Sequence, residues 1–342
     1  MRKLRIFENK RFSDLTTFRI GGRIKYYTEV ENKDQICEAV SLAKKKKLEI
    51  FVLGGGSDIL VSDKDFSGIA IKYVGTTISY LGDGKIKAEA GAIWDDLVNF
   101  SVEKNLQGLE CMSGIPGTVG ASPIQNIGAY GQELKNSFFS LIAFDINSEK
   151  FVEFDKSDCE FAYRESFFKK KENWQKYMIS DVTFQLKTDA KPQVSYDSLK
   201  NYLKERKIND PTLLEVRKAV LRIRAGKFEN PKDVGNAGSF FQNPVVDAKK
   251  IQDLRKNYSD IPCFDNGDGT YKCFAGWFIE NSGWKGKVYK GAGVSPRHAL
   301  ILINPESKAK ADDVYELSEK IINDVDKKFG VKLKREVQLI NF

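Results

Sequence analysis

The sequence predicts an α+β protein of two or three domains, and three observations lead to this prediction. A chain of 342 residues is too long for one compact core. Its hydrophobic content of 41% and its nine prolines are typical of folded domains and argue against long disordered segments. Helical and strand patterns both occur, and no internal repeat relates them. We therefore expect a mixed fold with a sizeable core in each domain.

The elements expected in the first part of the chain follow from periodicity and turn residues. A strand at 25–30 precedes a helix at 34–47, whose last lysines complement the negative helix end and meet solvent. The next elements are a strand at 50–53, a strand at 68–73, a hairpin turning at 82–84 and a helix at 94–104.

A change to polar composition near residue 187 indicates a linker, and a helix follows it. This helix opens with a capping box formed by Thr212 and Glu215. We expect one apolar face and an opposite face that carries Arg217, Lys218, Arg222 and Arg224. The other elements expected beyond residue 130 are strands at 138–146 and 179–186, a helix at 312–329 and a terminal strand at 331–340.

The most informative segment is an uncharged interval of 22 residues, 111–132, in a chain that is 30% charged. Five glycines break it up too much for an ordinary helix or strand: Gly114, Gly117, Gly120, Gly128 and Gly131. Glycine permits positive φ, so successive N–H groups can converge on an anion that no acidic side chain repels. We expect a phosphate-bearing ligand here. The alternative is a plain surface loop, although such loops usually carry solvating charges.

A second glycine-rich turn follows the expected strand at 50–53. It reads Gly54, Gly55, Gly56, Ser57, Asp58. The transition from a strand to glycines suits a phosphate site, but both the GKS/T ending of a nucleoside-triphosphate loop and the spacing of a GxGxxG dinucleotide loop are missing. Taken alone, this turn is a weak signal.

Net charge and cysteine content limit the classes of ligand and partner that we expect. The net charge of +8 is spread along the chain, so small anions are as plausible as nucleic acid, and we do not expect nucleic acid at the lysines of 44–47. No apolar leader or membrane-length segment is present, so we expect a cytoplasmic protein without membrane contact. The five cysteines form no CxxC pair, so we expect free thiols, mostly buried, and no metal site, although a hairpin turn could bring Cys263 and Cys273 together.

Three clusters place a reactive polar residue among glycines or aromatics. Arg164 in FAYRESFFK suits a carboxylate or phosphate, or else forms a surface ion pair with Glu165 or Glu160. Ser239 in GNAGSFFQNPVV could donate a proton or bind an anion, while the absence of GxSxG argues against a hydrolase nucleophile. Glu336 in KLKREVQLI points away from the apolar face or is simply solvated.

Seven segments, in one order over nearly the whole chain, resemble the UDP-N-acetylenolpyruvoylglucosamine reductase family, in its longer, Tyr-loop (type I) subclass. They are TFRIGG, LGGGSDIL, SGIPGTVGASPIQNIGAYGQE, FAYRESFFK, GNAGSFFQNP, AGWFIENSGWKG and HALILIN. The family reduces an enolpyruvyl nucleotide to UDP-N-acetylmuramate during bacterial peptidoglycan precursor synthesis. Several long matches in the same order make this resemblance specific.

The resemblance implies an FAD-binding fold of the vanillyl-alcohol-oxidase type with an added C-terminal α+β domain. The implied domains are 1–72 with 330–342 as one FAD subdomain, 73–228 as the other with a substrate loop near 188–200, and 229–329 for the substrate. Both glycine-rich turns then bind the FAD diphosphate, through Gly54, Gly55, Gly56, Ser57 and Asp58 and through Ile115, Pro116, Gly117, Thr118, Val119, Gly120 and Ala121. The residues implied near the flavin ring are Gln125, Asn126, Gly128, Ala129 and Tyr130.

The resemblance also implies the chemistry: NADPH reduces FAD, and the flavin passes hydride to the enolpyruvyl group. Arg164 and Glu336 match residues that polarise the substrate carboxylate, and Ser239 matches the proton donor. The implied substrate contacts are Tyr163, Tyr196, Lys227 and Asn243. This chain departs from the family pattern in two asparagine positions, which are occupied by Thr16 and Asp58; Asp58 adds a negative charge beside the diphosphate turn.

The expected partners are therefore UDP-N-acetylglucosamine enolpyruvate and NADPH, bound by a monomer. Two other functions remain open from the sequence. One is an FAD-dependent oxidase or dehydrogenase of the same fold that acts on another substrate. The other is a noncatalytic nucleotide-binding module, which the presence of Arg164, Ser239 and Glu336 disfavours.

Overall fold

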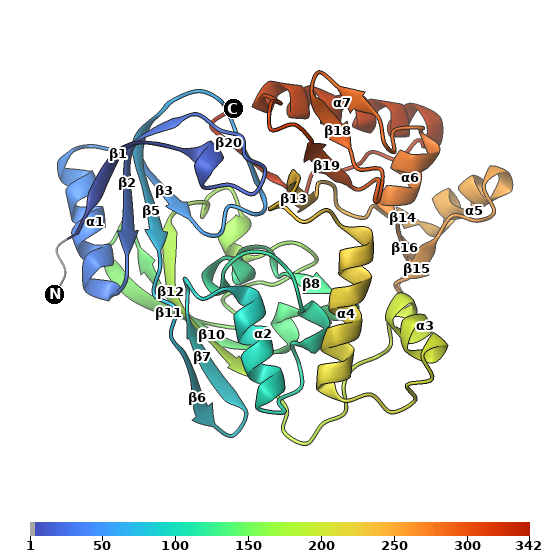
Figure 1. The fold of residues 1–342 in the computed structure, drawn as a ribbon, viewed down its shortest axis with the longest axis horizontal. Coiled ribbons are helices and arrows are strands. Elements are labelled where there is room, and N and C mark those ends of the chain that lie inside the picture. The colour runs from blue at the N-terminus through green and yellow to red at the C-terminus, as the bar shows by residue number, and fades with distance from the viewer. Residues whose placement is uncertain (1–3) are drawn as a thin grey trace. The chain divides into compact units, whose positions relative to one another are not determined.

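The computed structural model describes residues 4–342, which form two compact units built from interleaved chain segments (Figure 1). Unit 1 contains the described residues up to Lys10, together with Ile24–Gly55 and Phe66–Gly226. Unit 2 contains Arg11–Arg23, Gly56–Asp65 and Lys227–Phe342.

These bounds differ from the domains implied by the resemblance. The segments 11–23, 56–65 and 330–342 belong with the C-terminal part, and 24–55 clusters with 66–226 instead of forming its own unit. The implied grouping of 330–342 with a segment of the first 72 residues agrees with one pairing, since strand β20 (Gln338–Ile340) runs parallel to β4 (Ile59–Val61). Residues 1–3 of the expected first subdomain lie outside the described residues.

The described residues of unit 1 form two larger sheets, a two-stranded sheet of β8 and β9, and four α-helices. One sheet has the order β1-β2-β5-β3, in which β2 and β3 are parallel to β5; the other is antiparallel with the order β11-β10-β12-β7-β6. Its strands are β1 (Ile6–Arg11), β2 (Arg23–Val30), β3 (Ile50–Leu53), β5 (Phe66–Tyr73), β6 (Ile78–Gly82), β7 (Lys85–Glu89), β8 (Gly128–Ala129), β9 (Gln132–Glu133), β10 (Phe138–Asp145), β11 (Lys150–Asp155) and β12 (Tyr177–Gln185). Its helices are α1 (Lys33–Lys45), α2 (Trp94–Glu103), α3 (Asp197–Glu205) and α4 (Leu213–Lys227), with 3-10 turns at Glu110–Met112, Val119–Gln125, Leu134–Asn136 and Phe167–Lys169.

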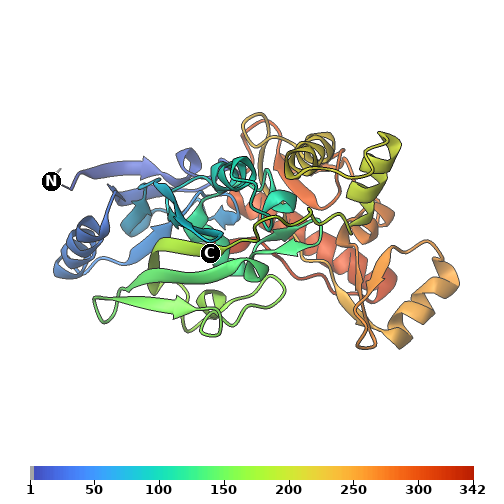
Figure 2. The ribbon, with the colours of Figure 1, turned by 90° about the horizontal axis from the view of Figure 1, so that it is seen from below.

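Helix α1 shows why the local patterns predicted these elements well. Asn32 caps it, because its side-chain oxygen accepts a hydrogen bond from the Gln35 amide at 3.0 Å. Its buried stripe, which includes Ile36 and Val40, recurs at helical spacing and joins a core shared with the antiparallel sheet. Figures 1 and 2 show α1 beside the first sheet, where it contacts β5. The predicted capping box of α4 is confirmed, since the Glu215 amide donates to the Thr212 hydroxyl at 3.2 Å.

Unit 2 has a four-stranded sheet with the order β13-β19-β18-β17 and a small sheet with the order β14-β16-β15. Its strands are β4 (Ile59–Val61), β13 (Gly235–Ser239), β14 (Val245–Asp247), β15 (Cys263–Asp265), β16 (Thr270–Cys273), β17 (Val288–Tyr289), β18 (Ala292–Val294), β19 (Ile301–Asn304) and β20 (Gln338–Ile340). Its helices are a 3-10 turn at Phe12–Asp14 and the α-helices α5 (Ala248–Asn257), α6 (Ala275–Asn281) and α7 (Ala311–Phe329).

Helix α7 organises the core of unit 2. Its buried residues Val314, Leu317, Ile321 and Val325 follow the i, i+3, i+4 rule, and the helix packs against β18 (Figure 1). It ends at Gly330, which has a φ of 60°. The terminal strand expected at 331–340 is wrong in extent, because regular pairing begins only at Gln338.

The expectation of free, mostly buried thiols is wrong for three of the five cysteines. Cys263 and Cys273 form a disulfide across the β15–β16 hairpin, where they are directly opposed. Cys37 is a free but exposed thiol. Cys111 and Cys159 are buried free thiols, as expected, and burial raises the pKa of both.

The capping of α1 makes a testable prediction. Asn32→Ala removes the side-chain acceptor of the Gln35 amide, and we expect it to lower the free energy of unfolding by about 1 kcal/mol. Urea unfolding followed by circular dichroism measures this change. Asn32→Ser, which keeps a capping oxygen, is the matched control and should stay close to the parent. Equal stability of the alanine and serine variants would contradict the assignment.

Candidate functional site

The two glycine-rich turns predicted separately from the sequence are in direct contact inside unit 1. A β-carbon placed on Gly55 would lie 2.8 Å from the Cα atom of Gly117. One placed on Gly54 would lie 3.1 Å from the β-carbon of Ala121. Only glycine permits this backbone approach. The two turns therefore form one backbone-lined site.

The hydrogen bonds of the second turn limit which amides can meet an anion. The amide of Val119 donates to Ala92 O at 2.9 Å, that of Gly120 to Ala90 O at 2.9 Å, and that of Ala121 to Thr118 O at 3.1 Å. The expectation that the whole segment 115–121 offers its amides is therefore wrong for these three residues. Within residues 4–342, no protein acceptor is bonded to the amides of Gly117 and Thr118.

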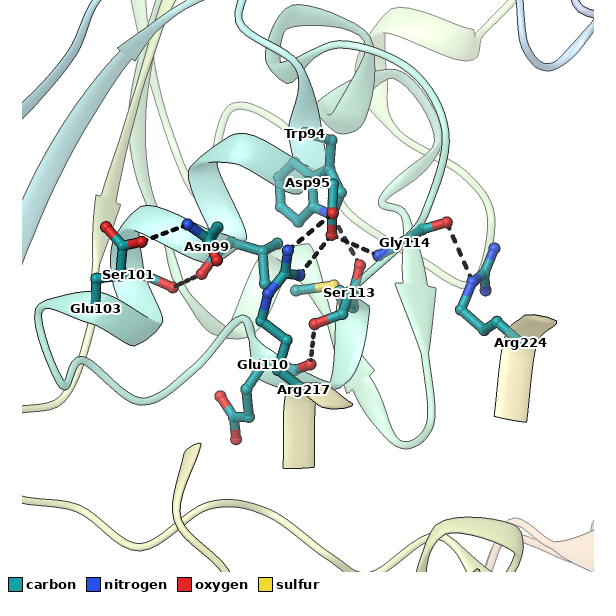
Figure 3. Close-up of polar contacts among 12 residues, drawn as sticks. Trp94, Asp95, Asn99, Ser101, Glu103, Glu110, Ser113, Gly114, Arg217 and Arg224 are labelled. Carbon is teal, nitrogen blue, oxygen red and sulfur yellow. Dashed lines mark hydrogen bonds and ion pairs between the residues drawn. The ribbon is translucent and has the colours of Figure 1, made fainter. Parts of the chain in front are cut away.

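Charged residues of α2 and α4 hold the start of the uncharged interval in place (Figure 3). Asp95 accepts two hydrogen bonds from Arg217, at 2.6 and 2.9 Å, and one from the Gly114 amide at 2.7 Å. The Gly114 carbonyl accepts a hydrogen bond from Arg224 Nε at 3.1 Å. Trp94, fully buried on α2, donates its indole N–H to Met112 O at 3.0 Å. Both peptide groups of Gly114 are thus fixed by side chains.

Burial and hydrogen bonding set the charge states in this cluster. Burial raises the pKa of Asp95, but the Arg217 and Gly114 donors outweigh it and hold the pKa below its ordinary value of 3.8. Burial lowers the pKa of Arg224, which still keeps its charge because the ordinary value is so high. Arg217 and Arg224, expected opposite the apolar face of this helix, therefore form contacts within unit 1.

The segment expected near the flavin ring forms a tight hairpin of β8 and β9. Tyr130 and Gly131 occupy its turn with φ values of 48° and 86°. Asn126 is fully buried and its side chain is used internally: it donates to Glu133 and to Ala162 O and accepts from the Lys135 amide. The Asn126 side chain therefore shapes the turn.

Arg164 is presented by a short turn whose backbone closes between Ala162 and Glu165. Its φ of 57° lies in the left-handed region, which is unfavourable for an arginine and often marks a functional position. One guanidinium nitrogen donates to Gly128 O at 2.9 Å, so the structure brings Arg164 to the flavin-ring segment. Lys169 lies behind the turn and donates to Arg164 O and to the Gln125 side chain, both at 3.1 Å.

The loop near 188–200, which the resemblance implies covers the substrate, packs on the same segment. The rings of Tyr196 and Tyr130 meet edge to face with centroids 5.5 Å apart. The buried carboxylate of Glu110 anchors the loop, because it accepts from the Gln193 amide at 3.1 Å and from the Gln132 side chain at 2.8 Å. Burial raises the pKa of Tyr196 and of Tyr130, so both phenols are neutral at pH 7.

In unit 2, a short antiparallel pairing places Phe240, the residue after Ser239, opposite Glu336. Glu336 N donates to Phe240 O at 2.9 Å, and Gln242 N donates to Lys334 O at 2.9 Å. Ser239 immediately precedes this ladder and is partly buried. Glu336 is only 8% exposed, so the alternative of a simply solvated glutamate is wrong. It also lies before β20, not within a long terminal strand.

The remaining predicted residues have more ordinary surroundings. Asn243 accepts a hydrogen bond from the Ala275 amide at 3.0 Å, which ties it to the start of α6. Lys227 is exposed at the end of α4. Tyr163 lies beside the Arg164 guanidinium, whose carbon is 5.4 Å from the ring centroid. The main-chain carbonyl of Asp58 accepts from the Gln338 amide at 3.0 Å.

Several supporting residues were missed from the sequence. Arg217 and Arg224 are seven residues apart, two helical turns on one face, and this spacing was the available signal. Glu110 directly precedes the uncharged interval, yet nothing local distinguishes it from a solvated acid. Asp95 looked like an ordinary first-turn acid of α2.

Comparison with known proteins agrees with this geometry. Residues 24–145 match the family model described as an FAD binding domain, and residues 230–340 match the C-terminal domain of UDP-N-acetylenolpyruvoylglucosamine reductase. The solved reductase of that name from Thermus caldophilus superimposes with a TM-score of 0.71 at 23% identity, covering 99% of this chain and 100% of that one. The fold and the glycine-lined site thus define an FAD-binding protein, as predicted.

Full-length relatives identify the family. The UDP-N-acetylenolpyruvoylglucosamine reductase of Pseudomonas aeruginosa is 37% identical over 98% of this chain and 99% of its own length. That of Neisseria meningitidis serogroup B is 41% identical over 95% of both chains. The chain belongs to the UDP-N-acetylenolpyruvoylglucosamine reductase family. Within residues 4–342, no helix is both long and apolar enough to span a membrane.

The residues of unit 1 fit a dinucleotide diphosphate. The glycine cradle leaves no room for side chains at Gly55, the interval is uncharged, and the Gly117 and Thr118 amides are not bonded to protein acceptors in residues 4–342. Such a donor set suits the diphosphate of FAD.

The Asp95 cluster makes a testable prediction about stability and FAD binding. Asp95→Asn removes the charge that pairs with Arg217, and we expect it to lower the free energy of unfolding at pH 7 by about 2 kcal/mol. It should also weaken FAD binding, since the Gly114 turn loses its anchor. Urea unfolding and titration of flavin fluorescence measure the two effects.

The pH dependence follows from the depressed pKa of Asp95. Its stabilising contribution is complete above the unfolded value near 4 and is lost as the pH falls through the lower folded value. The difference between parent and Asp95→Asn should therefore shrink below about pH 4. Asp96→Asn, an exposed neighbour on α2, is the matched control. A difference that is unchanged at low pH would contradict the assigned ion pair.

Proposed function

We propose that this chain is an FAD-dependent reductase that converts UDP-N-acetylglucosamine enolpyruvate to UDP-N-acetylmuramate for peptidoglycan precursor synthesis, with NADPH as the reductant. The observation that carries the proposal is a buried Glu336 paired with Phe240, the residue directly after Ser239, in a chain with the glycine-lined FAD cradle. Full-length similarity to reductases of this name supports it.

When bound, FAD would take up hydride from NADPH and supply it to the enolpyruvyl group. We assign Arg164 the binding of the substrate carboxylate, because a planar guanidinium can hold two carboxylate oxygens at once. Its fixed backbone and its bond to Gly128 O support this role. Charge that develops toward the carboxylate during reduction is stabilised by this preorganised cation.

Ser239 supplies the proton to the carbon adjacent to the site of hydride addition. A serine hydroxyl is a weak acid, so it serves only where it is held beside a strongly basic carbon. Glu336 assists at the substrate carboxylate either as a neutral acid or through a bound cation or water, since two bare carboxylates repel.

The remaining proposed contacts hold the nucleotide. Tyr196 closes over the substrate diphosphate from its loop, and Tyr163 contacts the substrate beside Arg164. Lys227 and Asn243 contact the nucleotide, Asn243 through the amide nitrogen that α6 does not use. We further propose a cytoplasmic monomer, because the pathway's nucleotide substrates are soluble and no second chain is needed for these roles; light scattering tests the oligomeric state.

An anaerobic stopped-flow experiment tests the proposed reaction. NADPH should bleach the flavin absorbance of the FAD-loaded protein, and UDP-N-acetylglucosamine enolpyruvate should restore it, because the two half-reactions share the flavin. A protein that gains no flavin absorbance with FAD would overturn the proposal. Flavin that is reduced by alcohols or sugars, and does not respond to the enolpyruvyl nucleotide, would instead indicate an oxidase or dehydrogenase.

Replacing Ser239 tests its role as proton donor. Ser239→Ala should leave flavin reduction by NADPH within about twofold of the parent and slow reoxidation by the enolpyruvyl nucleotide by about 100-fold or more, as expected for loss of a general acid. Ser282→Ala is the control, since its buried hydroxyl at the end of α6 has no hydrogen-bond partner within residues 4–342. Equal loss in both half-reactions would be inconsistent with proton donation.

A further inference from the structure

A short segment of unit 2, residues 15–18, lies between the Gly56 turn and the strand that carries Ser239. Gly56 has a φ of 64°, and a β-carbon on it would lie 2.2 Å from Leu15 O. On the other side, a β-carbon on Gly235 would lie 2.6 Å from Phe18 O. No side chain fits at either contact, so the three segments pack backbone against backbone.

Thr17 is hydrogen-bonded to both of its neighbours. Its amide donates to Gly56 O at 2.9 Å, and the Asn236 amide donates to Thr17 O at 3.1 Å. Its hydroxyl oxygen lies 2.7 Å from Asn236 O and 3.3 Å from Gly56 O. The single hydroxyl proton therefore bonds chiefly to Asn236 O. The glycine turn and β13 are thus joined through one residue.

Asn236 extends this connection to Ser239. Its side-chain oxygen accepts from the Gly238 amide at 3.0 Å, and its side-chain nitrogen donates to Val234 O at 2.8 Å. Gly238 has a φ of 70°, and the pairing of β13 with β19 shifts register between Asn236 and Ser239. Ser239 therefore lies at the end of a bulge, and the Asn236 side chain fixes the shape of that bulge. Bulges of this kind aim a side chain in a chosen direction.

We propose that Thr17 is a positioning residue for Ser239, acting through Asn236, and that it transmits ordering of the Gly56 turn to the Ser239 bulge. The inference rests on the proposed function, in which Gly56 meets the FAD diphosphate and Ser239 donates the proton. Displacement of a reacting group by about 1 Å can cost about 100-fold in rate, so the loss of one fixing bond has a measurable effect.

Thr17→Val is the most direct variant, because it keeps the shape and the backbone bonds and removes only the hydroxyl. Flavin reduction by NADPH should stay within about twofold of the parent, while reoxidation by UDP-N-acetylglucosamine enolpyruvate should slow by about tenfold or more. Thr17→Ser should restore the rate. Thr16→Val is the matched control, since that buried hydroxyl bonds to Ile20 O within its own turn.

Hydrogen exchange of the peptide covering 235–240, with and without FAD, tests the coupling independently of turnover. FAD should slow exchange there by about threefold or more in the parent, in Thr17→Ser and in Thr16→Val, and should have no such effect in Thr17→Val. If Thr17→Val does not fold, Thr17→Ala serves in its place. Parent-like reoxidation and exchange in the hydroxyl-free variant would overturn the proposal.

The outcomes separate this proposal from the proposed function. A parent protein that does not respond to the enolpyruvyl nucleotide contradicts the reductase assignment, whereas the exchange measurement still decides whether Thr17 couples the two segments. A parent that turns over normally, together with a Thr17→Val variant equally slow in both half-reactions, indicates general loss of structure and overturns the positioning role.

Discussion

The backbone contact between Gly55 and Gly117 is the constraint on which the site in unit 1 depends. It brings two turns from distant parts of the chain close enough that no side chain can separate them. The rest of the uncharged interval is arranged around it: Arg164 bonds to Gly128 O, and Tyr196 packs on Tyr130. A displacement of this one contact would therefore disturb both the glycine-lined cradle and the segment that Arg164 and Tyr196 contact.

Charged residues outside the uncharged interval bind its backbone and side chains. Asp95 and Arg224 bind the peptide groups of Gly114, and Arg217 holds Asp95. Glu110 binds the Gln193 amide and the Gln132 side chain. Buried charges contribute little net stability, because desolvation offsets their attraction, but each one penalises alternatives that leave it unpaired. The ion pairs therefore select one conformation of a glycine-rich loop that has little conformational preference of its own.

Signals in neighbouring residues predicted the elements whose structure depends on interactions between neighbouring residues. The helix at 34–47, the capping box at Thr212 and the glycine turns were all visible because caps, periodicity and positive φ leave marks on neighbouring residues. The features that the sequence did not predict depend on contacts between segments far apart in the chain. The ion pair of Arg217 on α4 with Asp95 on α2 was not predicted, and the implied bounds separated 11–23 and 56–65 from the C-terminal part with which they cluster. The roles of Arg164, Ser239 and Glu336 came from the resemblance alone.

The run Gly54–Gly56 links the two units, and each part of it packs into its own unit in the same manner. Gly55 meets the Gly117 backbone in unit 1, and Gly56 meets the Leu15 backbone in unit 2. A backbone contact of this kind involves no side-chain torsion, so no change of rotamer can lengthen it. In the proposed reaction Ser239 must be placed within a fraction of an ångström, and the hydrogen bonds of Thr17 and Asn236 on the same side of unit 2 support that placement.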